Sequence, residues 1–312
     1  MLFVLPFMVM AILFSGIWFV DFQPFSATVQ EDAFIAFSLP ASEWGGMLLF
    51  GFLLLCMAYL IFFFTNRYKL LDQQTTLPAL LFVLLGSVVA IHLSDIYWLL
   101  SAFLIMVALA RLQTAINHLY VNAPLFDFGA LLMCAIIVCP KLSFLLLWAV
   151  AVLIFSGRST FRDFAALLVG LLFPVGLLAF WGYWTDTLDT LPERYFRLLW
   201  NGEWLDALPA SECIRLAILG TFLLFAVLLI FSRYAVLVVN QRRGLFSFIS
   251  FSLFLLFIPV LFPVGYYEVL FLFTLPLSVL YAHYFITNRL FWLGDVFFLL
   301  FLLACAIDYI MP

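Results

Sequence analysis

Long apolar segments separated by short polar loops repeat along almost the whole chain, and this pattern limits the fold more than any other feature. The first twenty residues, MLFVLPFMVMAILFSGIWFV, carry no charge, and similar segments recur into the C-terminal region. Only 10% of the 312 residues are charged, whereas an average soluble domain has about 25%. One soluble core could not bury the side chains of 40 Phe and nine Trp. The sequence therefore predicts an all-α, polytopic transmembrane helical bundle.

Breaks in the apolar pattern predict about eleven spans within one integral membrane domain that covers residues 1–312. They are expected near residues 2–20, 46–65, 77–92, 96–111, 123–139, 142–156, 164–184, 214–239, 244–264, 269–287 and 290–307. Several are shorter than the roughly twenty residues that a perpendicular span needs. The short pairs 77–111 and 123–156 are therefore either hairpins of short spans or re-entrant pairs. The first segment lacks the basic start and the cleavage site of a signal peptide, so we expect it to be retained.

The basic residues predict the orientation, because Lys and Arg favour the cytoplasmic side of short loops. With the N-terminus inside, nine of the 13 basic residues fall on the inner face: Arg67, Lys69, Arg111, Arg158, Arg162, Arg233, Arg242, Arg243 and Arg289. Lys141, Arg194, Arg197 and Arg215 fall outside, together with 13 of the 17 acidic residues. We therefore predict an inner N-terminus and an outer C-terminus.

Two of the expected outer loops, about 21–45 and 185–213, are longer than the rest. The first carries Asp21, Glu31, Asp32 and Glu43 and no basic residue. The second contains LPERYFRLLW, residues 191–200, in which a proline near the start precedes aromatic and leucine residues at helical spacing. This pattern predicts an amphipathic helix in the plane of the membrane interface. The preceding FWGYW, residues 180–184, is typical of the aromatic belt at the end of a span.

Glu31 and Asp32 are candidate catalytic residues in the first outer loop. A carboxylate there could accept a proton from an acceptor hydroxyl or bind a divalent cation, the only cofactor that these residues suggest. Neighbouring residues on an extended segment point in opposite directions, so at most one of the two faces a given substrate. The alternative is that an outer loop of a membrane protein simply carries acidic residues.

Arg194 and Arg197 are candidate ligands for the phosphate of a lipid-linked substrate. They lie three residues apart on the expected interfacial helix, and the guanidinium fork matches phosphate oxygens. Contact with ordinary lipid headgroups would explain them equally well.

Asp295 is the clearest polar residue inside an expected span, and His283 near the inner end of the preceding span is its candidate partner. A charge in a span is costly and by default faces protein or a water-filled cavity. The pair predicts either a proton relay or a hydrogen bond between two helices. His92 and Asp95 could join Glu31 or Asp32 in an outer cluster.

Other features bear on function more weakly. Pro259, Pro263 and Pro276 interrupt the late segments, where prolines bend helices and open cavities but also occur in inert spans. His118 falls in a polar inner loop and is expected to be solvated. The chain has no GxGxxG, Walker A, HExxH or Cys/His pattern, so we expect no metal site of those types, no nucleotide-driven transport by this chain alone and no nucleic-acid partner.

Residues 123–184, from APLFDFGALLMC to LLAFWGYW, and the closing LPLSVLYAHYFITNRLFWLGDVFFLLFLL resemble a bacterial (Bacteroidota-type) multi-pass inner-membrane family. That family is defined only as a domain of unknown function. The resemblance covers most of the chain in length and in span layout. It implies a bacterial inner (cytoplasmic) membrane location and no particular activity.

The architecture also resembles the polytopic GT-C glycosyltransferases, which share an inner N-terminus, an acidic first outer loop and a long amphipathic loop between spans seven and eight. This resemblance implies transfer of a sugar from a polyprenyl-phosphate donor at the outer face. Asp32 or Glu31 would be the base, and Arg194 and Arg197 would hold the donor phosphate. The alternatives are a small-solute or lipid transporter that uses Asp295 and His283, and a non-enzymatic scaffold with a membrane-protein partner.

Overall fold

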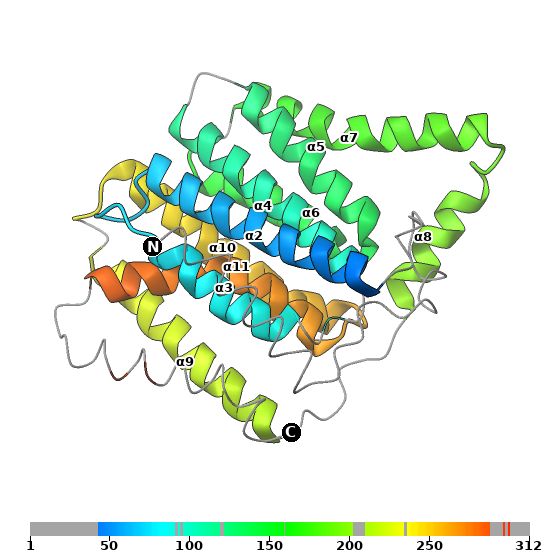
Figure 1. The fold of residues 1–312 in the computed structure, drawn as a ribbon. Coiled ribbons are helices and arrows are strands. Elements are labelled where there is room, and N and C mark those ends of the chain that lie inside the picture. The colour runs from blue at the N-terminus through cyan, green and yellow to red at the C-terminus, as the bar shows by residue number, and fades with distance from the viewer. Residues whose placement is uncertain are drawn as a thin grey trace.

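The computed structural model describes residues 43–90, 93, 96–118, 122–158, 160–201, 210–233 and 236–287, with 296 and 299 besides, and no strand occurs among them. The helices are α2 (Glu43–Arg67), α3 (Leu77–Ala90), α4 (Ile96–Asn117), α5 (Ala123–Val138), the 3₁₀ helix η2 (Pro140–Phe144), α6 (Leu145–Phe155), α7 (Phe161–Trp184), α8 (Thr190–Trp200), α9 (Ala210–Ser232), α10 (Val239–Leu261) and α11 (Tyr266–Thr287) (Figure 1). The predicted all-helical class is confirmed for these residues.

Each apolar segment predicted between residues 46 and 287 coincides with a helix. Five are long and apolar enough to cross a membrane: residues 49–67 of α2, and α4, α7, α10 and α11. The remaining apolar helices, α3, α5, α6 with η2, and the later part of α9, are shorter. The segments 2–20 and 290–307 lie outside the described residues, apart from positions 296 and 299. The helices therefore fit a multi-pass membrane protein.

Most helix ends differ from the predicted spans by a few residues, α9 ends at Ser232 instead of near 239, and α4 and α10 extend furthest beyond the prediction. α4 continues to Asn117 instead of ending near residue 111, so it is long enough to cross a membrane. Its last polar side chains donate hydrogen bonds inside the bundle: Gln113 Nε2 donates to Ser247 Oγ at 2.7 Å, and Asn117 Nδ2 donates to the Gln113 carbonyl. α10 begins at Val239 instead of near 244, because Gln241 is buried and hydrogen-bonded rather than solvated.

α11 is the central helix of one half of the bundle. It is buried along almost its whole length and packs against α3, α9 and α10 (Figure 1). α5 lies between α4 and α7 in the other half. Trp148 on α6 connects α5 with α10. Its indole packs on Phe128 of α5 and Phe251 of α10, and the indole N–H donates to Ser250 Oγ at 3.1 Å. Aromatic side chains therefore fill the interior between these helices.

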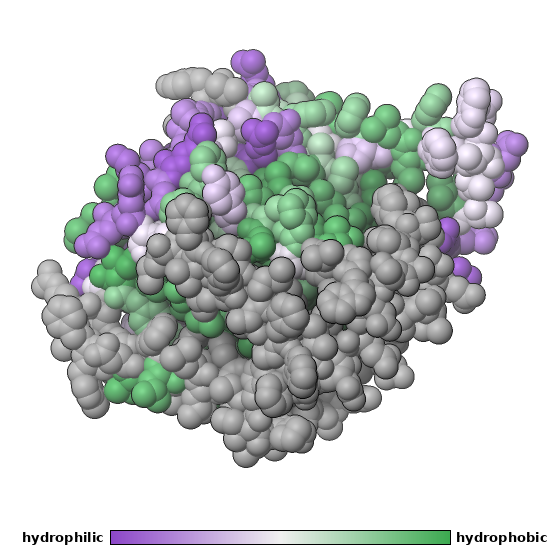
Figure 2. All heavy atoms as spheres, viewed as in Figure 1, coloured by the Kyte–Doolittle hydropathy of each residue, from purple (hydrophilic) through white to green (hydrophobic). Residues whose placement is uncertain are grey.

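One end of the bundle is polar. Here α2, α4, α6, α9 and α11 finish and α10 begins, as hydrogen bonds between these helix ends show. The described basic residues predicted for the inner face all belong to the helix ends and turns of this end: Arg67, Lys69, Arg111, Arg158, Arg162, Arg233, Arg242 and Arg243. Hydrophilic residues gather at the corresponding side of the surface in Figure 2. We call it the polar end.

The opposite end carries α8 and is called the α8 end. α7 runs beyond the bundle towards it, and α8 turns back from the tip of α7 (Figure 1). Tyr195 of α8 shares a hydrogen bond of 2.9 Å with Ser143 of η2, and Trp200 packs edge-on against Phe262, directly after α10. α8 is therefore fixed at the end where α10 finishes.

Candidate functional site

α8 is the amphipathic helix that the sequence predicts. Its Pro192 lies in the first helical turn, where the missing N–H has no partner to lose. Leu198 and Leu199 are buried against the bundle, whereas Phe196 and Trp200 are 61% and 60% exposed. A helix with a packed leucine side and outward aromatic side chains is suited to lie along a membrane interface.

Arg194 and Arg197 both lie on α8, as predicted, and differ in burial. Arg194 is half-buried at the edge of the packed side, and Arg197 is exposed one turn before the end of the helix. A cation near the C-terminal end of a helix is stabilised by the partial negative charge of the free carbonyls. The two guanidinium groups therefore present positive charge beside the exposed aromatic side chains.

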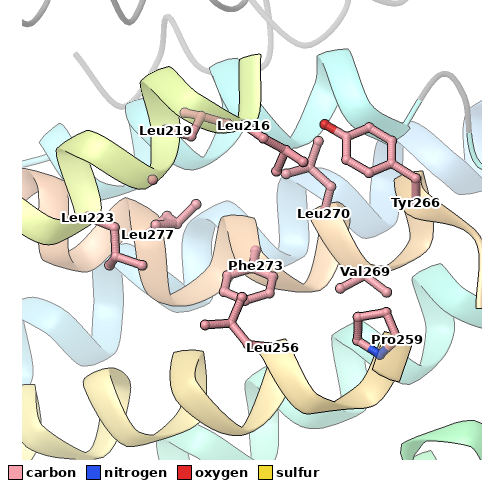
Figure 3. A pocket seen from close by; sticks show the side chains of 11 residues that line it. Leu216, Leu219, Leu223, Leu256, Pro259, Tyr266, Val269, Leu270, Phe273 and Leu277 are labelled. Carbon is pink, nitrogen blue, oxygen red and sulfur yellow. The ribbon is translucent and has the colours of Figure 1, made fainter. Parts of the chain in front are cut away.

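An apolar groove of about 280 Å³ lies between α9, α10 and α11 (Figure 3). Its walls include Leu219 and Leu223 of α9, Pro259 of α10, and Phe273 and Leu277 of α11. Among the described lining residues, Tyr266 at the start of α11 is the one whose side chain carries a polar group. The groove reaches the surface, since its lining residues Leu216 and Leu256 are 37% and 52% exposed. Such a wall favours a hydrocarbon chain over any polar ligand.

The groove and α8 belong to the same end of the bundle. Pro259 and Leu256 lie in the last two turns of α10, and Tyr266 begins α11 after a short linker. Phe262, in that linker, holds Trp200 of α8 at a ring-centroid distance of 6.1 Å. A molecule with an apolar chain and an anionic head would place its chain in the groove and its head near the positive charge of α8, because both lie at the same end of the bundle.

His283 is completely buried in α11, and neither ring nitrogen has a hydrogen-bond partner in the part of the chain that the structure describes. Its predicted partner Asp295 lies outside the described residues, so the relay between them stays a prediction. A buried imidazole without partners is costly in an apolar helix.

The other predicted site residues divide in two. Glu31, Asp32, His92 and Asp95 lie outside the described residues. His118 is exposed at the end of α4, as expected for a solvated residue, and its carbonyl accepts a hydrogen bond from the guanidinium of Arg158 at 2.7 Å. Within the described part of the chain no group of three or more His, Cys, Asp or Glu side chains could hold a metal ion.

Prolines were the one weak sign of the groove in the sequence. Pro259 and Pro276 interrupt α10 and α11, and Pro259 lines the groove, while Pro263 lies in the linker between the two helices. The leucines and phenylalanines of the wall could not be told from residues that face lipid, because both are apolar.

Comparisons with known proteins do not identify a family for this chain. No family model, curated protein or solved structure matches the chain. The described helices therefore define a class of protein: a helical protein whose apolar helices fit several membrane spans.

Proposed function

We propose that this protein is a multi-pass bacterial inner-membrane transferase that uses an anionic, lipid-linked donor of the polyprenyl-phosphate class at the α8 end. The observation that carries the proposal is the groove between α9, α10 and α11, with an apolar wall and an opening at the surface. Its position at the same end as Arg194 and Arg197 matches a donor with a hydrocarbon chain and a phosphate.

In this proposal the chain crosses the membrane eleven times, and the α8 end faces outwards. The acceptor hydroxyl oxygen attacks the donor carbon that is bonded to the phosphate. The new C–O bond forms as the old one breaks, the proton passes to Asp32 with Glu31 next to it, and the polyprenyl phosphate leaves with the electron pair. Arg194 and Arg197 stabilise the phosphate charge.

The test measures binding of undecaprenyl phosphate to the purified full-length protein by native mass spectrometry. Gly220 lines the groove, and a Cβ atom there would meet no atom within 4 Å. Gly220→Phe should therefore place a ring in the groove without disturbing the helices and lower the affinity at least tenfold. Gly176→Phe on α7 is the matched control, because a Cβ atom there also has open space. Equal affinity in the two variants would refute the groove as the lipid site.

The role of the arginines is tested with the same ligand and its uncharged counterpart. A hydrogen bond to a charged group contributes about 1.5–3 kcal/mol, so losing both arginines should weaken phosphate binding roughly tenfold or more. Arg194→Gln with Arg197→Gln should lower the affinity for undecaprenyl phosphate and leave that for undecaprenol unchanged. An equal loss for both lipids would show that the arginines do not recognise the phosphate.

A second candidate function, proton-linked transport of a small solute, is favoured by His283. Its imidazole is buried in α11, and neither nitrogen has a hydrogen-bond partner among the described residues. A membrane-embedded ionisable residue is by default a functional candidate. His283→Gln should then abolish proton-coupled uptake into proteoliposomes loaded with a pH-sensitive dye. Normal binding of undecaprenyl phosphate without any proton movement would favour the transferase instead.

A further inference from the structure

The polar end contains a second cavity, of about 450 Å³, far along the bundle from the apolar groove. Two segments far apart in the sequence form its wall: residues 65–74, at the end of α2 and in the following turn, and residues 238–241, at the start of α10. Neither segment forms the cavity alone, so the cavity depends on the packing of the end of α2 against the start of α10.

Gln241 fixes the position of an acidic group in this wall. Its side chain is 5% exposed, and its Nε2 donates to the Leu70 carbonyl and to Asp72 Oδ1, each at 3.1 Å. Asp72 itself is exposed and lines the cavity. A carboxylate that is held by one amide still has oxygen lone pairs to accept a further donor.

Lys69 lines the same cavity with an unfavourable backbone. Its φ angle of 50° lies in the left-handed region, which glycine adopts more easily. The conformation closes α2, because the Leu70 N–H then donates to the Thr65 carbonyl at 3.1 Å. Glycine would fulfil that backbone role at lower cost, so the presence of lysine points to use of its ammonium group.

Thr65 contributes a hydroxyl that has no hydrogen-bond partner among the described residues. The side chain is 1% exposed and lines the cavity. Many other helical hydroxyls in the bundle donate to a carbonyl three or four residues earlier, as Thr114 does to Ala110 at 3.0 Å and Ser278 does to Leu275 at 2.8 Å. A buried hydroxyl without a partner costs about 1–3 kcal/mol, which a ligand in the cavity would recover.

The charges in the wall indicate the class of ligand. Lys69 and Asp72 are its two charged residues, and most of the other lining residues carry amides or hydroxyls, including Asn66, Asn240 and the pair Gln73–Gln74. A ligand with a single charge would leave either Lys69 or Asp72 opposite a neutral group. A ligand with one charge of each sign would satisfy both.

We propose that this cavity binds a small zwitterion, with its anionic group on Lys69 and its ammonium group on Asp72. The same chemistry occurs in a soluble amino acid or amino phosphate and in the ethanolamine phosphate headgroup of a lipid. The binding site is separate from the α8 end, so it is independent of the lipid-linked donor.

The test is a ligand-induced shift of the melting temperature of the full-length protein in detergent. Glycerophosphoethanolamine and glycine are the soluble zwitterions, phosphatidylethanolamine added to the micelles is the lipid source, and inorganic phosphate and ethylammonium are the controls that carry charge of one sign only. We expect a zwitterion to raise the melting temperature and to bind at least tenfold more tightly than either control. A response to phosphatidylethanolamine alone would assign the lipid source, and a response to a soluble probe the free solute.

Two variants make the result specific. Asp72→Asn should weaken zwitterion binding at least tenfold. Lys69→Asn should do the same without loss of stability, because asparagine tolerates the left-handed conformation. Lys141→Asn, at the opposite end, is the matched control and should bind normally. The proposal is overturned if no zwitterion binds, or if Lys69→Asn and Asp72→Asn bind as the control does.

Discussion

The contact between α5 and α7 allows one prediction to be worked out from distances. A Cβ atom on Gly170 of α7 would lie 2.3 Å from the Phe126 carbonyl oxygen of α5, whereas ordinary contact begins at 3.4 Å. Both atoms belong to helix backbones, so α7 itself would have to move by about 1 Å. Overpacking of this kind costs about 1–3 kcal/mol, and alanine in place of glycine returns up to about 1 kcal/mol of helix propensity. Gly170→Ala should therefore lower the free energy of unfolding by about 1–2 kcal/mol.

Gly176 of α7 provides the control, because no atom lies within 4 Å of a Cβ atom there. Gly176→Ala should leave the free energy of unfolding unchanged or raise it by up to about 1 kcal/mol. The assay is denaturant unfolding in detergent micelles, followed by far-ultraviolet circular dichroism. If Gly170→Ala is as stable as Gly176→Ala, the close approach of α5 and α7 is wrong.

Three further predictions concern single side chains, measured by the same unfolding assay. Asp163→Asn should lower the free energy of unfolding by about 3–5 kcal/mol, because it removes the carboxylate that lies 3.4 Å from the buried guanidinium of Arg158. Replacing both residues, Arg158 by Met and Asp163 by Leu, should cost less, and an equal loss in the two variants would contradict the role of the ion pair. His283→Leu should stabilise the protein by about 1–3 kcal/mol, since it removes two buried nitrogens that have no hydrogen-bond partner among the described residues. Destabilisation would show that the imidazole does form a hydrogen bond, for instance with Asp295. Lys69→Gly should raise stability by about 1 kcal/mol through relief of the left-handed backbone, and a loss would show that the lysine side chain stabilises the fold.

The sequence predicted the elements better than their limits. The spacing of apolar residues located α8 and the helices between residues 46 and 287, because burial or lipid contact requires such residues. The ends of α4 and α10 were misplaced where polar side chains are satisfied by tertiary hydrogen bonds. Gln113 and Gln241 look like loop residues until Ser247 and Leu70 are brought next to them.

The candidate sites were less predictable, for a physical reason. The groove is lined by leucines that differ from lipid-facing leucines only in their neighbours. The polar cavity joins Asp72 to Gln241, which are 169 residues apart, so no local pattern relates them. Arg194 and Arg197 could be named in advance because the pattern of α8 itself suggests an interface.

Photo-crosslinking tests the central claim, lipid binding in the apolar groove, most directly. Undecaprenyl phosphate with a diazirine on its hydrocarbon chain would be irradiated with the full-length protein in nanodiscs, and the modified peptides identified. We predict modification concentrated on the wall formed by Leu219, Leu223 and Phe273, reduced by excess unlabelled lipid and lost in Gly220→Phe. Modification spread evenly over the exposed faces of the helices, or unchanged in Gly220→Phe, would contradict it.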